Sequence, residues 1–230
     1  MDLETRAMTT PPQSFIPALG LKVLTPFYDR LIARSGDEGR WRSAFIRQMN
    51  APDGGTILEI GAGTGSLLAV AAERTGARLV ALDPDPQALD IAAAKLQAHR
   101  DRLTIIQGFG NDLPDHPALR EAAFDRIACC LLLHHLTRPQ KQATLRNAYR
   151  LLKPGGELHI ADWTKPASLK MHLAYLQIRL IDGFATTGDN ARGLVPEFMK
   201  AAGFTDVAET FSAPSRFGQF GFFRGIKANS

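Results

Sequence analysis

Five short apolar segments alternate with helical patterns between residues 56 and 161, and this order leaves few architectures open. Each apolar segment is bounded by turn residues, which is typical of buried strands. Strands and helices that alternate at this spacing predict a parallel sheet with helices on both faces, so we expect a doubly wound α/β fold. The predicted strands are Thr56–Ile60, Arg78–Leu82, Leu103–Gln107, Phe124–Cys130 and Glu157–Ala161, and the predicted helices are Ser66–Thr75, Pro86–His99 and Gln140–Leu151.

The residues outside this alternation extend the predicted fold at both ends. A mostly helical stretch from Thr25 to Met49 precedes it, and we predict that residues 1–50 form an N-terminal helical cap. Residues 51–230 are predicted to form the main domain, with residues 164–203 as a lid inserted before the last two strands. The segments expected after Trp163 are a helix over Ser168–Ile181, a polar glycine-rich turn from Gly183 to Gly193, a helix at Pro196–Ala202, and strands around Thr205–Phe211 and Arg216–Ile226.

Neither a membrane span nor a disulfide framework is expected. The longest uninterrupted apolar run, Ile127–Leu133, has seven residues, far fewer than the ~20 needed to cross a bilayer. The first eight residues carry acids and lack the apolar stretch of a signal peptide. The two cysteines, Cys129 and Cys130, are adjacent in a predicted strand and therefore point to opposite faces. We expect a reducing compartment and a cytoplasmic location.

The positive charge is spread along the chain rather than gathered into a basic surface. There are 27 basic and 23 acidic residues, which gives a formal charge of +4. The densest basic cluster, Arg40, Arg42 and Arg47, lies on a helical pattern that also carries Trp41 and Phe45, and a solvated helix face is the favoured interpretation. We expect no nucleic-acid partner, no integral membrane association and a small-molecule substrate, and the sequence predicts no oligomeric state.

A glycine-rich turn joins the first predicted strand to its helix, in the run Glu59-Ile-Gly61-Ala-Gly63-Thr-Gly65. Glycines allow positive φ and a close approach of a ligand, and the helix N-terminus behind the turn attracts an anionic group such as a carboxylate. A dinucleotide fingerprint is the competing interpretation. However, Glu59 would repel a pyrophosphate and attract an amine, so the pattern favours a ligand that carries an amino group.

An acid ends the second predicted strand. Asp83, in the run Leu82-Asp83-Pro84, follows Gly63 by 20 residues and is placed to accept hydrogen bonds from both hydroxyls of a ribose. The alternative is that Asp83 only caps a turn. In combination with the glycine-rich turn, ligand binding is the favoured interpretation.

Together, these residues and the order of elements after them resemble the class I S-adenosylmethionine-dependent methyltransferases, over roughly Thr56 to Trp163. Within that family the chain is most similar to the small-molecule branch that includes quinone C-methylases. The resemblance implies a Rossmann-like methyltransferase fold: a seven-stranded, mostly parallel sheet with an N-terminal helical segment and a helical lid. It also implies S-adenosyl-L-methionine as cofactor and S-adenosyl-L-homocysteine as product. Further matching blocks are Gly108-Phe-Gly-Asn-Asp-Leu-Pro114, Phe124–His135 and Leu151-Leu-Lys-Pro-Gly-Gly156.

The resemblance also assigns roles to cofactor-binding residues. Gly61, Gly63 and Gly65 would shape the turn under the methionine part, and Glu59 would lie near the cationic end of the cofactor. Asp83 would hold the ribose, while Pro84, Gly108 and Gly110 would lie beside the adenine. Phe109 stands where relatives often have an Asp, so here backbone groups and stacking would hold the adenine. Cys130 and Leu131, at the end of the fourth predicted strand, complete the expected cofactor-binding residues.

Three residues are candidates for catalysis. Tyr28 matches a tyrosine with which related enzymes cover the cofactor, although a core tyrosine is an equal alternative. His134 and His135 follow the fourth strand, where a histidine can deprotonate an acceptor hydroxyl, but capping of the next loop is the commoner role. Asp162 and Trp163 are expected to face the same crevice, although a strand-end cap with a packing aromatic is at least as good an interpretation. No metal is expected, because the six histidines show no i, i+4 pair and the cysteines lack ligand spacing.

The C-terminal region is rich in phenylalanine, and five of the 13 Phe lie in the last 20 residues: Phe211, Phe217, Phe220, Phe222 and Phe223. An apolar cap would suit a hydrophobic acceptor such as a phenol, quinone, polyketide or lipid-like compound, although sheet-edge packing is the commoner explanation. The predicted function is methyl transfer to such an acceptor. The alternatives are a nucleic-acid methyltransferase, a cofactor-binding protein of the same fold that does not methylate, and a nicotinamide dehydrogenase.

Overall fold

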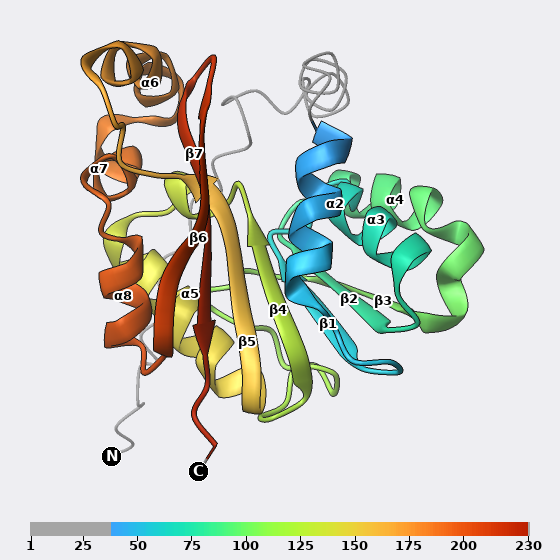
Figure 1. Ribbon diagram of the computed structural model, residues 1–230. Coiled ribbons are helices and arrows are strands. Elements are labelled where there is room, and N and C mark those ends of the chain that lie inside the picture. The colour runs from blue at the N-terminus through green and yellow to red at the C-terminus, as the bar shows by residue number, and fades with distance from the viewer. Residues whose placement is uncertain (1–37, 230) are drawn as a thin grey trace, which may run out of the picture.

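The computed structural model describes residues 38–229, in which seven strands form one sheet in the order β3-β2-β1-β4-β5-β7-β6 (Figure 1). The first five strands are parallel, and β7 runs antiparallel to both β5 and β6. The doubly wound, mostly parallel sheet is therefore confirmed. The strands are β1 (Thr56–Ile60), β2 (Arg78–Asp83), β3 (Leu103–Gln107), β4 (Phe124–Cys130), β5 (Leu152–Trp163), β6 (Thr205–Ser215) and β7 (Gly218–Ile226).

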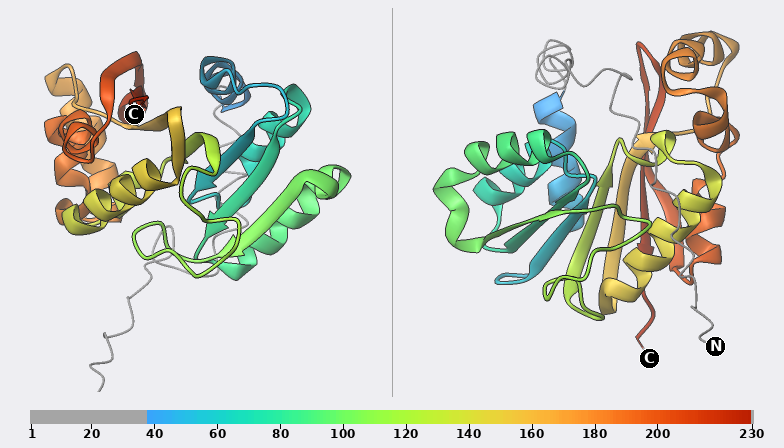
Figure 2. Two further views of the ribbon diagram at one scale, coloured as in Figure 1. Left: turned by 90° about the horizontal axis from the view of Figure 1, so that it is seen from below. Right: turned by 180° about the vertical axis from the view of Figure 1, so that it is seen from behind.

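Helices cover both faces of the sheet, as Figure 2 shows from below and from behind. One face is covered by α2 (Glu38–Met49), α3 (Ser66–Arg74) and α4 (Pro86–Lys95). The other face is covered by α5 (Arg138–Leu151) and α8 (Val195–Ala201). Tyr28 and most of the predicted N-terminal cap lie outside the described residues, within which α2 is the first helix.

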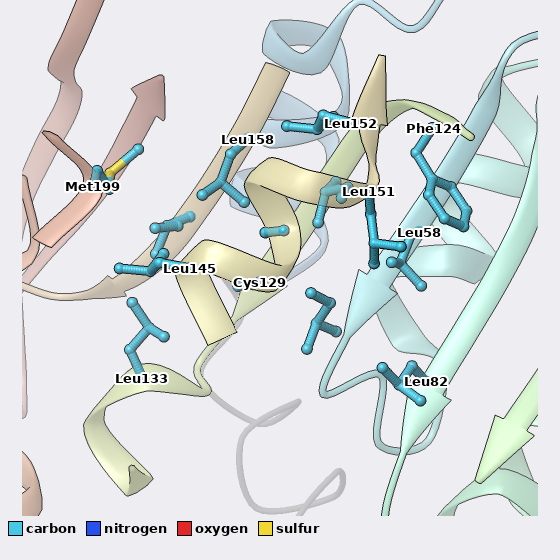
Figure 3. Packing of buried hydrophobic residues seen from close by; sticks show 14 of the residues in the cluster. Leu58, Leu82, Phe124, Cys129, Leu133, Leu145, Leu151, Leu152, Leu158 and Met199 are labelled. Atoms are coloured by element: carbon cyan, nitrogen blue, oxygen red, sulfur yellow. The ribbon is translucent and has the colours of Figure 1, made fainter. Parts of the chain in front are cut away.

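Each face of the sheet has its own apolar core, because side chains alternate along buried strands. Leu58 of β1 packs in the cluster under α5 and α8, whereas its neighbour Ile57 packs under α2 and α3. Figure 3 shows the first cluster, with Leu145 and Leu151 of α5 set against the sheet. Cys129 belongs to this cluster and Cys130 packs against the other, so the predicted divergence of the two cysteines is confirmed.

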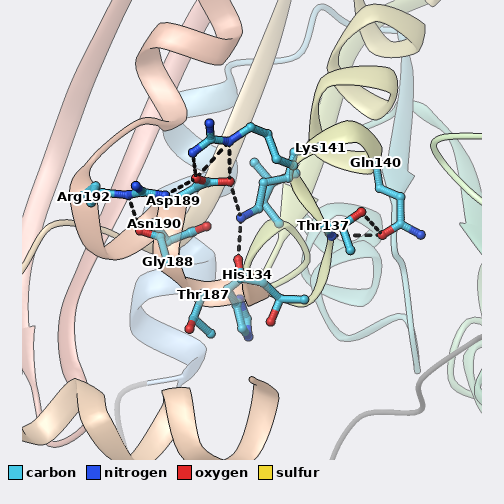
Figure 4. Close-up of polar contacts among 12 residues, drawn as sticks. His134, Thr137, Gln140, Lys141, Thr187, Gly188, Asp189, Asn190 and Arg192 are labelled. Carbon is cyan, nitrogen blue, oxygen red and sulfur yellow. Dashed lines mark hydrogen bonds and ion pairs between the residues drawn. The ribbon is translucent and has the colours of Figure 1, made fainter. Parts of the chain in front are cut away.

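The segment between β5 and β6 forms three helices rather than two. The prediction of a polar turn from Gly183 to Gly193 is wrong, because α7 (Phe184–Arg192) lies between α6 (Leu169–Asp182) and α8. The two glycines end the helices, with φ of 94° and 75°. The buried polar residues between them bond to distant parts of the chain. Lys141 donates to the Thr186 carbonyl (Figure 4), and Asn190 Nδ2 donates to the Trp163 carbonyl.

Several element boundaries also differ from the predicted ones. Helix α5 begins at Arg138 rather than Gln140, because Gln140 Oε1 accepts a 2.9 Å hydrogen bond from the backbone N–H of Thr137 and closes the first turn (Figure 4). Strand β5 begins at Leu152 and includes the Lys153–Gly156 run that was expected to turn. Helix α4 ends at Lys95, and a 3₁₀ helix, η2 (Gln97–Arg102), follows it.

Candidate functional site

A cavity of about 320 Å³ opens at the carboxyl ends of β1, β2 and β4, where open α/β sheets bind ligands. The sheet brings most of the predicted site residues to this one cavity, although they come from four separate stretches of the chain. The predicted residues that line it are Glu59, Gly61, Gly63, Asp83, Pro84, Gly108, Phe109, Gly110, Cys130, Leu131 and His135.

The glycine-rich turn after β1 forms one wall of the cavity. Gly63 has a φ of +49°, and a Cβ added to it would meet no other atom within 4 Å, so the space beside this backbone is open. Gly65 does not line the cavity. It has a φ of +71° at the start of α3, and a Cβ there would lie 2.9 Å from the Cβ of Ala92 in α4. Gly63 therefore faces the ligand space, whereas Gly65 allows two helices to approach.

A buried carboxylate lies in the same wall. Glu59 is 2% exposed, and its Oε2 atom has no hydrogen-bond partner among the described residues. Burial raises the pKa of Glu59 to about 8, and the charge of Arg42 opposes this shift. An unpaired buried oxygen is costly in a folded protein, so this atom is placed to meet a hydrogen-bond donor or a cation in the cavity.

Arg42 of α2 also lines the cavity, and the sequence analysis missed this role. Its neighbours in the basic cluster, Arg40 and Arg47, are exposed as expected for a solvated helix face. No pattern in the sequence separates Arg42 from them. Its place follows from the packing of α2 on α3 and on β5, which turns this one side chain toward Glu59.

Asp83 ends β2 and holds the neighbouring backbone. Its Oδ2 atom accepts a 2.8 Å hydrogen bond from the Gly63 N–H, and its Oδ1 atom accepts a 2.9 Å hydrogen bond from the Asp85 N–H. Burial raises the pKa of Asp83 above its ordinary value. Each carboxylate oxygen has a second lone pair, so the carboxylate retains acceptor capacity toward the cavity. The capping role and the ligand role are thus compatible.

The loop after β3 forms the opposite wall, with Gly108, Phe109, Gly110 and Asn111. The side-chain amide of Asn147 in α5 donates a 2.9 Å hydrogen bond to the Gly110 carbonyl and fixes the loop. The backbone N–H of Gly108 donates a 3.0 Å hydrogen bond to the Asp83 carbonyl. The wall at which an adenine was expected is therefore built from backbone held by α5 and β2.

The two adjacent histidines have different surroundings. They lie in the 3₁₀ helix η3 (Leu133–His135) after β4, and only His135 lines the cavity. His134 is 2% exposed, and its Nδ1 atom lies 2.6 Å from Oδ1 of the fully buried Asp162. Burial lowers the pKa of His135 to about 3, and the neighbouring His134 adds to this shift.

Asp162 and Trp163 were expected to face the crevice, but neither lines the cavity. The Asp162 carboxylate accepts backbone hydrogen bonds from Leu133 at 2.8 Å and from Trp163 at 2.7 Å. Trp163 is 9% exposed and packs edge-on against Phe220. The interpretation as a strand-end cap with a packing aromatic describes this pair.

Asp182, at the end of α6, is a second residue that the sequence analysis missed. Its carboxylate lies 3.7 Å from Nε2 of His134 and 3.6 Å from Nδ1 of His135. It is 47 residues from His135 in the sequence, and only the return of α6 and α7 over η3 brings the three side chains together. No spacing rule in the sequence signals such a contact.

The C-terminal phenylalanines are packing residues. Phe222 and Phe223 are buried on opposite faces of β7, and Phe220 contacts Trp41 and Trp163. None of the five predicted cap residues lines the cavity. The exposed apolar side chains in this region instead lie mainly along α6, at Leu169, Leu173 and Leu180. No helix among the described residues is both long and apolar enough to span a bilayer.

The comparisons with known proteins agree with this geometry. Residues 57–156 match the family model described as a methyltransferase domain. The chain is 30% identical over 148 residues to a ubiquinone/menaquinone biosynthesis C-methyltransferase of Syntrophotalea carbinolica. The aligned region covers 63% of this chain and 60% of that protein. The chain is also 30% identical over 163 residues to a demethylmenaquinone methyltransferase of Tropheryma whipplei, and this aligned region covers 66% of the chain and 63% of the relative. This chain thus spans about three fifths of the length of these relatives.

A solved structure shows the same fold. Phosphoethanolamine N-methyltransferase 2 of Haemonchus contortus, in complex with phosphomonomethylethanolamine and S-adenosylhomocysteine, matches with a TM-score of 0.67 at 16% identity, covering 82% of this chain and 52% of that one. This likeness concerns the fold, whereas the family model and the curated relatives concern the sequence. The chain therefore contains a methyltransferase domain at residues 57–156, and it resembles the class I S-adenosylmethionine-dependent methyltransferases in sequence and in fold.

Proposed function

We propose that this protein transfers a methyl group from S-adenosylmethionine to a hydrophobic small-molecule acceptor. The observation that carries the proposal is Oε2 of Glu59, a buried oxygen without a hydrogen-bond partner among the described residues, in the wall of a cavity built by the glycine-rich turn. An ammonium group is the natural partner for such an atom, because it supplies both hydrogen-bond donors and positive charge. A pyrophosphate carries no hydrogen-bond donor for this oxygen, and the ionised carboxylate would repel it.

The residues present fit the cofactor. Glu59 would bind its amino group, and Gly63 leaves open space for its methionine chain. Asp83, which is hydrogen-bonded to the glycine-rich turn at Gly63, would accept hydrogen bonds from the ribose hydroxyls, and the loop from Gly108 to Gly110 would border the adenine. When bound, the cofactor supplies a methyl group on a sulfonium, which is already an excellent leaving group. The protein's task is then to position the acceptor and to exclude water.

The acceptor would lie toward the η3 side of the cavity. His135, Leu132 and Leu136 line this part, and Thr186 of α7 lies across from them. One imidazole among aliphatic side chains suits an aromatic acceptor with a hydroxyl group, which His135 would orient by a hydrogen bond. His134 would not touch the acceptor itself, because its ring is buried against Asp162 and does not line the cavity. The quinone-methylating relatives support the same substrate class.

A binding titration tests the cofactor first. We expect calorimetry to show that the protein binds S-adenosylmethionine and S-adenosylhomocysteine and does not bind a nicotinamide dinucleotide. Glu59→Gln keeps the size of the side chain and removes its charge, and it should weaken S-adenosylmethionine binding at least tenfold. Glu73→Gln, at an exposed position of α3, is the matched control and should bind like the unchanged protein. Binding of the dinucleotide in place of S-adenosylmethionine would overturn the proposal.

Turnover tests the reaction itself. Production of S-adenosylhomocysteine should require an added acceptor, and hydroquinones and phenols with aliphatic substituents should serve better than short oligonucleotides. If the protein binds the cofactor and no acceptor in such a panel gives turnover, the alternative of a cofactor-binding protein that does not methylate is favoured. Turnover with oligonucleotides alone would contradict the proposed substrate class.

A further inference from the structure

We propose that His134, His135 and Asp182 form a binding site for one divalent transition-metal ion of the zinc class, at the edge of the cavity. Two imidazoles and one carboxylate are a ligand set that such ions use in catalytic sites, with a further position left open. The site is independent of the proposed methyl transfer, since it is assigned from these three side chains alone.

The three side chains already converge without an ion. Their ligand atoms lie within 4.8 Å of one another. Nε2 of His134 is 3.7 Å from one Asp182 oxygen, and Nδ1 of His135 is 3.6 Å from the other. Both distances are too long for a hydrogen bond. They are close to the roughly 3.4 Å that separates two ligand atoms bound at about 2.1 Å to one tetrahedral ion.

The contact between His134 and Asp162 prepares the first ligand. The Asp162 carboxylate accepts backbone hydrogen bonds from Leu133 and Trp163, and it lies 2.6 Å from Nδ1 of His134. A carboxylate can only accept, so Nδ1 carries a proton. In the neutral imidazole, which is the form that binds a metal ion, the lone pair is then on Nε2, the nitrogen that faces Asp182. A buried carboxylate behind a histidine is the usual support of a metal-binding imidazole, because it fixes both the tautomer and the ring orientation.

The charges around Asp182 leave a place for a cation. Its side chain is 10% exposed, and the ion-pair partners found for it among residues 38–229 are the two histidines. The Asp162 carboxylate lies against the other ring nitrogen of His134 and is a second negative group nearby. Lone pairs on His134 and Asp182 that face one another repel unless a positive charge lies between them. A divalent ion would neutralise both carboxylates.

The fold also places the ion where a ligand can reach it. His135 lines the cavity, and Thr186, four residues after Asp182, lines it as well. Three protein ligands leave a position for water or for an oxygen of a molecule in the cavity. If the proposed function holds, a hydroxyl of the acceptor would take this position, where the positive charge would favour loss of its proton to water in the cavity. The oxygen would then form a bond to the methyl carbon as the carbon–sulfur bond of the sulfonium breaks.

Metal binding can be measured without cofactor or acceptor. The protein is stripped with a chelator and titrated with Zn²⁺ in competition with a chromophoric chelator, and with Co²⁺ while its visible absorption is recorded. We expect one ion per chain and Co²⁺ bands typical of four- or five-coordinate sites. Asp182→Asn and His135→Ala should each weaken Zn²⁺ binding at least tenfold, and Asp162→Asn should weaken it by about 10- to 100-fold.

His172→Ala is the matched control, since this exposed histidine lies on α6 away from the three ligands and should leave the affinity unchanged. Circular dichroism and the urea unfolding midpoint of each variant show that it is folded. A failure of S-adenosylmethionine binding in the unchanged protein would count against the proposed function alone. The metal site is overturned if the unchanged protein takes up no stoichiometric Zn²⁺, or if Asp182→Asn and His135→Ala bind it as tightly as His172→Ala does.

Discussion

The carboxylate of Asp83 accepts a 2.8 Å hydrogen bond from the backbone N–H of Gly63, 20 residues earlier in the chain. This bond ties the carboxyl end of β2 to the glycine-rich turn after β1, so the residue proposed to hold the ribose also shapes the turn beneath the methionine chain. The two halves of the proposed cofactor site are therefore mechanically coupled, and substitutions at Asp83 should affect both.

Asp83→Ala should weaken S-adenosylmethionine binding by about 1–3 kcal/mol, the scale of lost charge-assisted hydrogen bonds. Asp83→Asn retains one acceptor oxygen and should lose less. Calorimetry measures both effects, and Asp90→Ala, at an exposed position of α4, serves as control. An unchanged affinity in Asp83→Ala would refute the role of Asp83 in the site.

Gly63 and Gly65 should respond differently to the same substitution. Both have positive φ, so an alanine costs each about 1–2 kcal/mol of folding free energy. At Gly65 the new Cβ must also displace Ala92, and we expect Gly65→Ala to lose about 1–3 kcal/mol more in urea unfolding. At Gly63 the new methyl occupies open cavity space, and Gly63→Ala should show the larger loss of cofactor affinity. The reverse order would mean that the ligand does not lie against Gly63.

Glu59 should make the cofactor-free protein less stable as pH rises. Its pKa is 4.5 in an unfolded chain and is raised to about 8 by burial, so between these values the folded state holds a proton that the unfolded state releases. The stabilisation is complete below pH 4.5 and is lost as pH rises through about 8, by at most about 1.4 kcal/mol per pH unit. Glu59→Gln cannot ionise and should flatten this slope in urea unfolding across that window. A slope identical to that of the unchanged protein would place the responsible group elsewhere.

The polar contacts that anchor α7 should be unequal in energy. Lys141 is fully buried, donates to the Thr186 carbonyl and lies 3.6 Å from Asp189, which also pairs with Arg138 and Arg192 (Figure 4). Asp189→Asn leaves the buried ammonium without its counter-charge and should cost about 3 kcal/mol or more. Lys141→Met leaves Asp189 with two arginines and should cost less. Urea unfolding decides the order, and equal losses would contradict this account.

The sequence predicted those features that depend on local pattern. The strands β1, β3 and β4 have the predicted bounds, because short apolar runs between turn residues specify buried strands with little help from the rest of the chain. The glycine-rich turn and Asp83 were placed in the cavity wall from sequence for a similar reason: their residue types have few uses at the carboxyl end of a parallel strand.

Other features were decided only when distant parts of the chain packed together. The segment from Gly183 to Gly193 was expected to be a polar turn, yet residues Phe184–Arg192 form a helix. Its buried polar residues find hydrogen-bond partners in Lys141 and Trp163. In the same way, Arg42 came to line the cavity and Asp182 came to lie beside His134 and His135. The spacing of apolar residues along a segment shows whether it forms a strand or a helix, and this pattern determined the strands of the sheet. Whether a polar side chain is buried depends on partners that lie far away in the sequence, and only the tertiary structure brings those partners near.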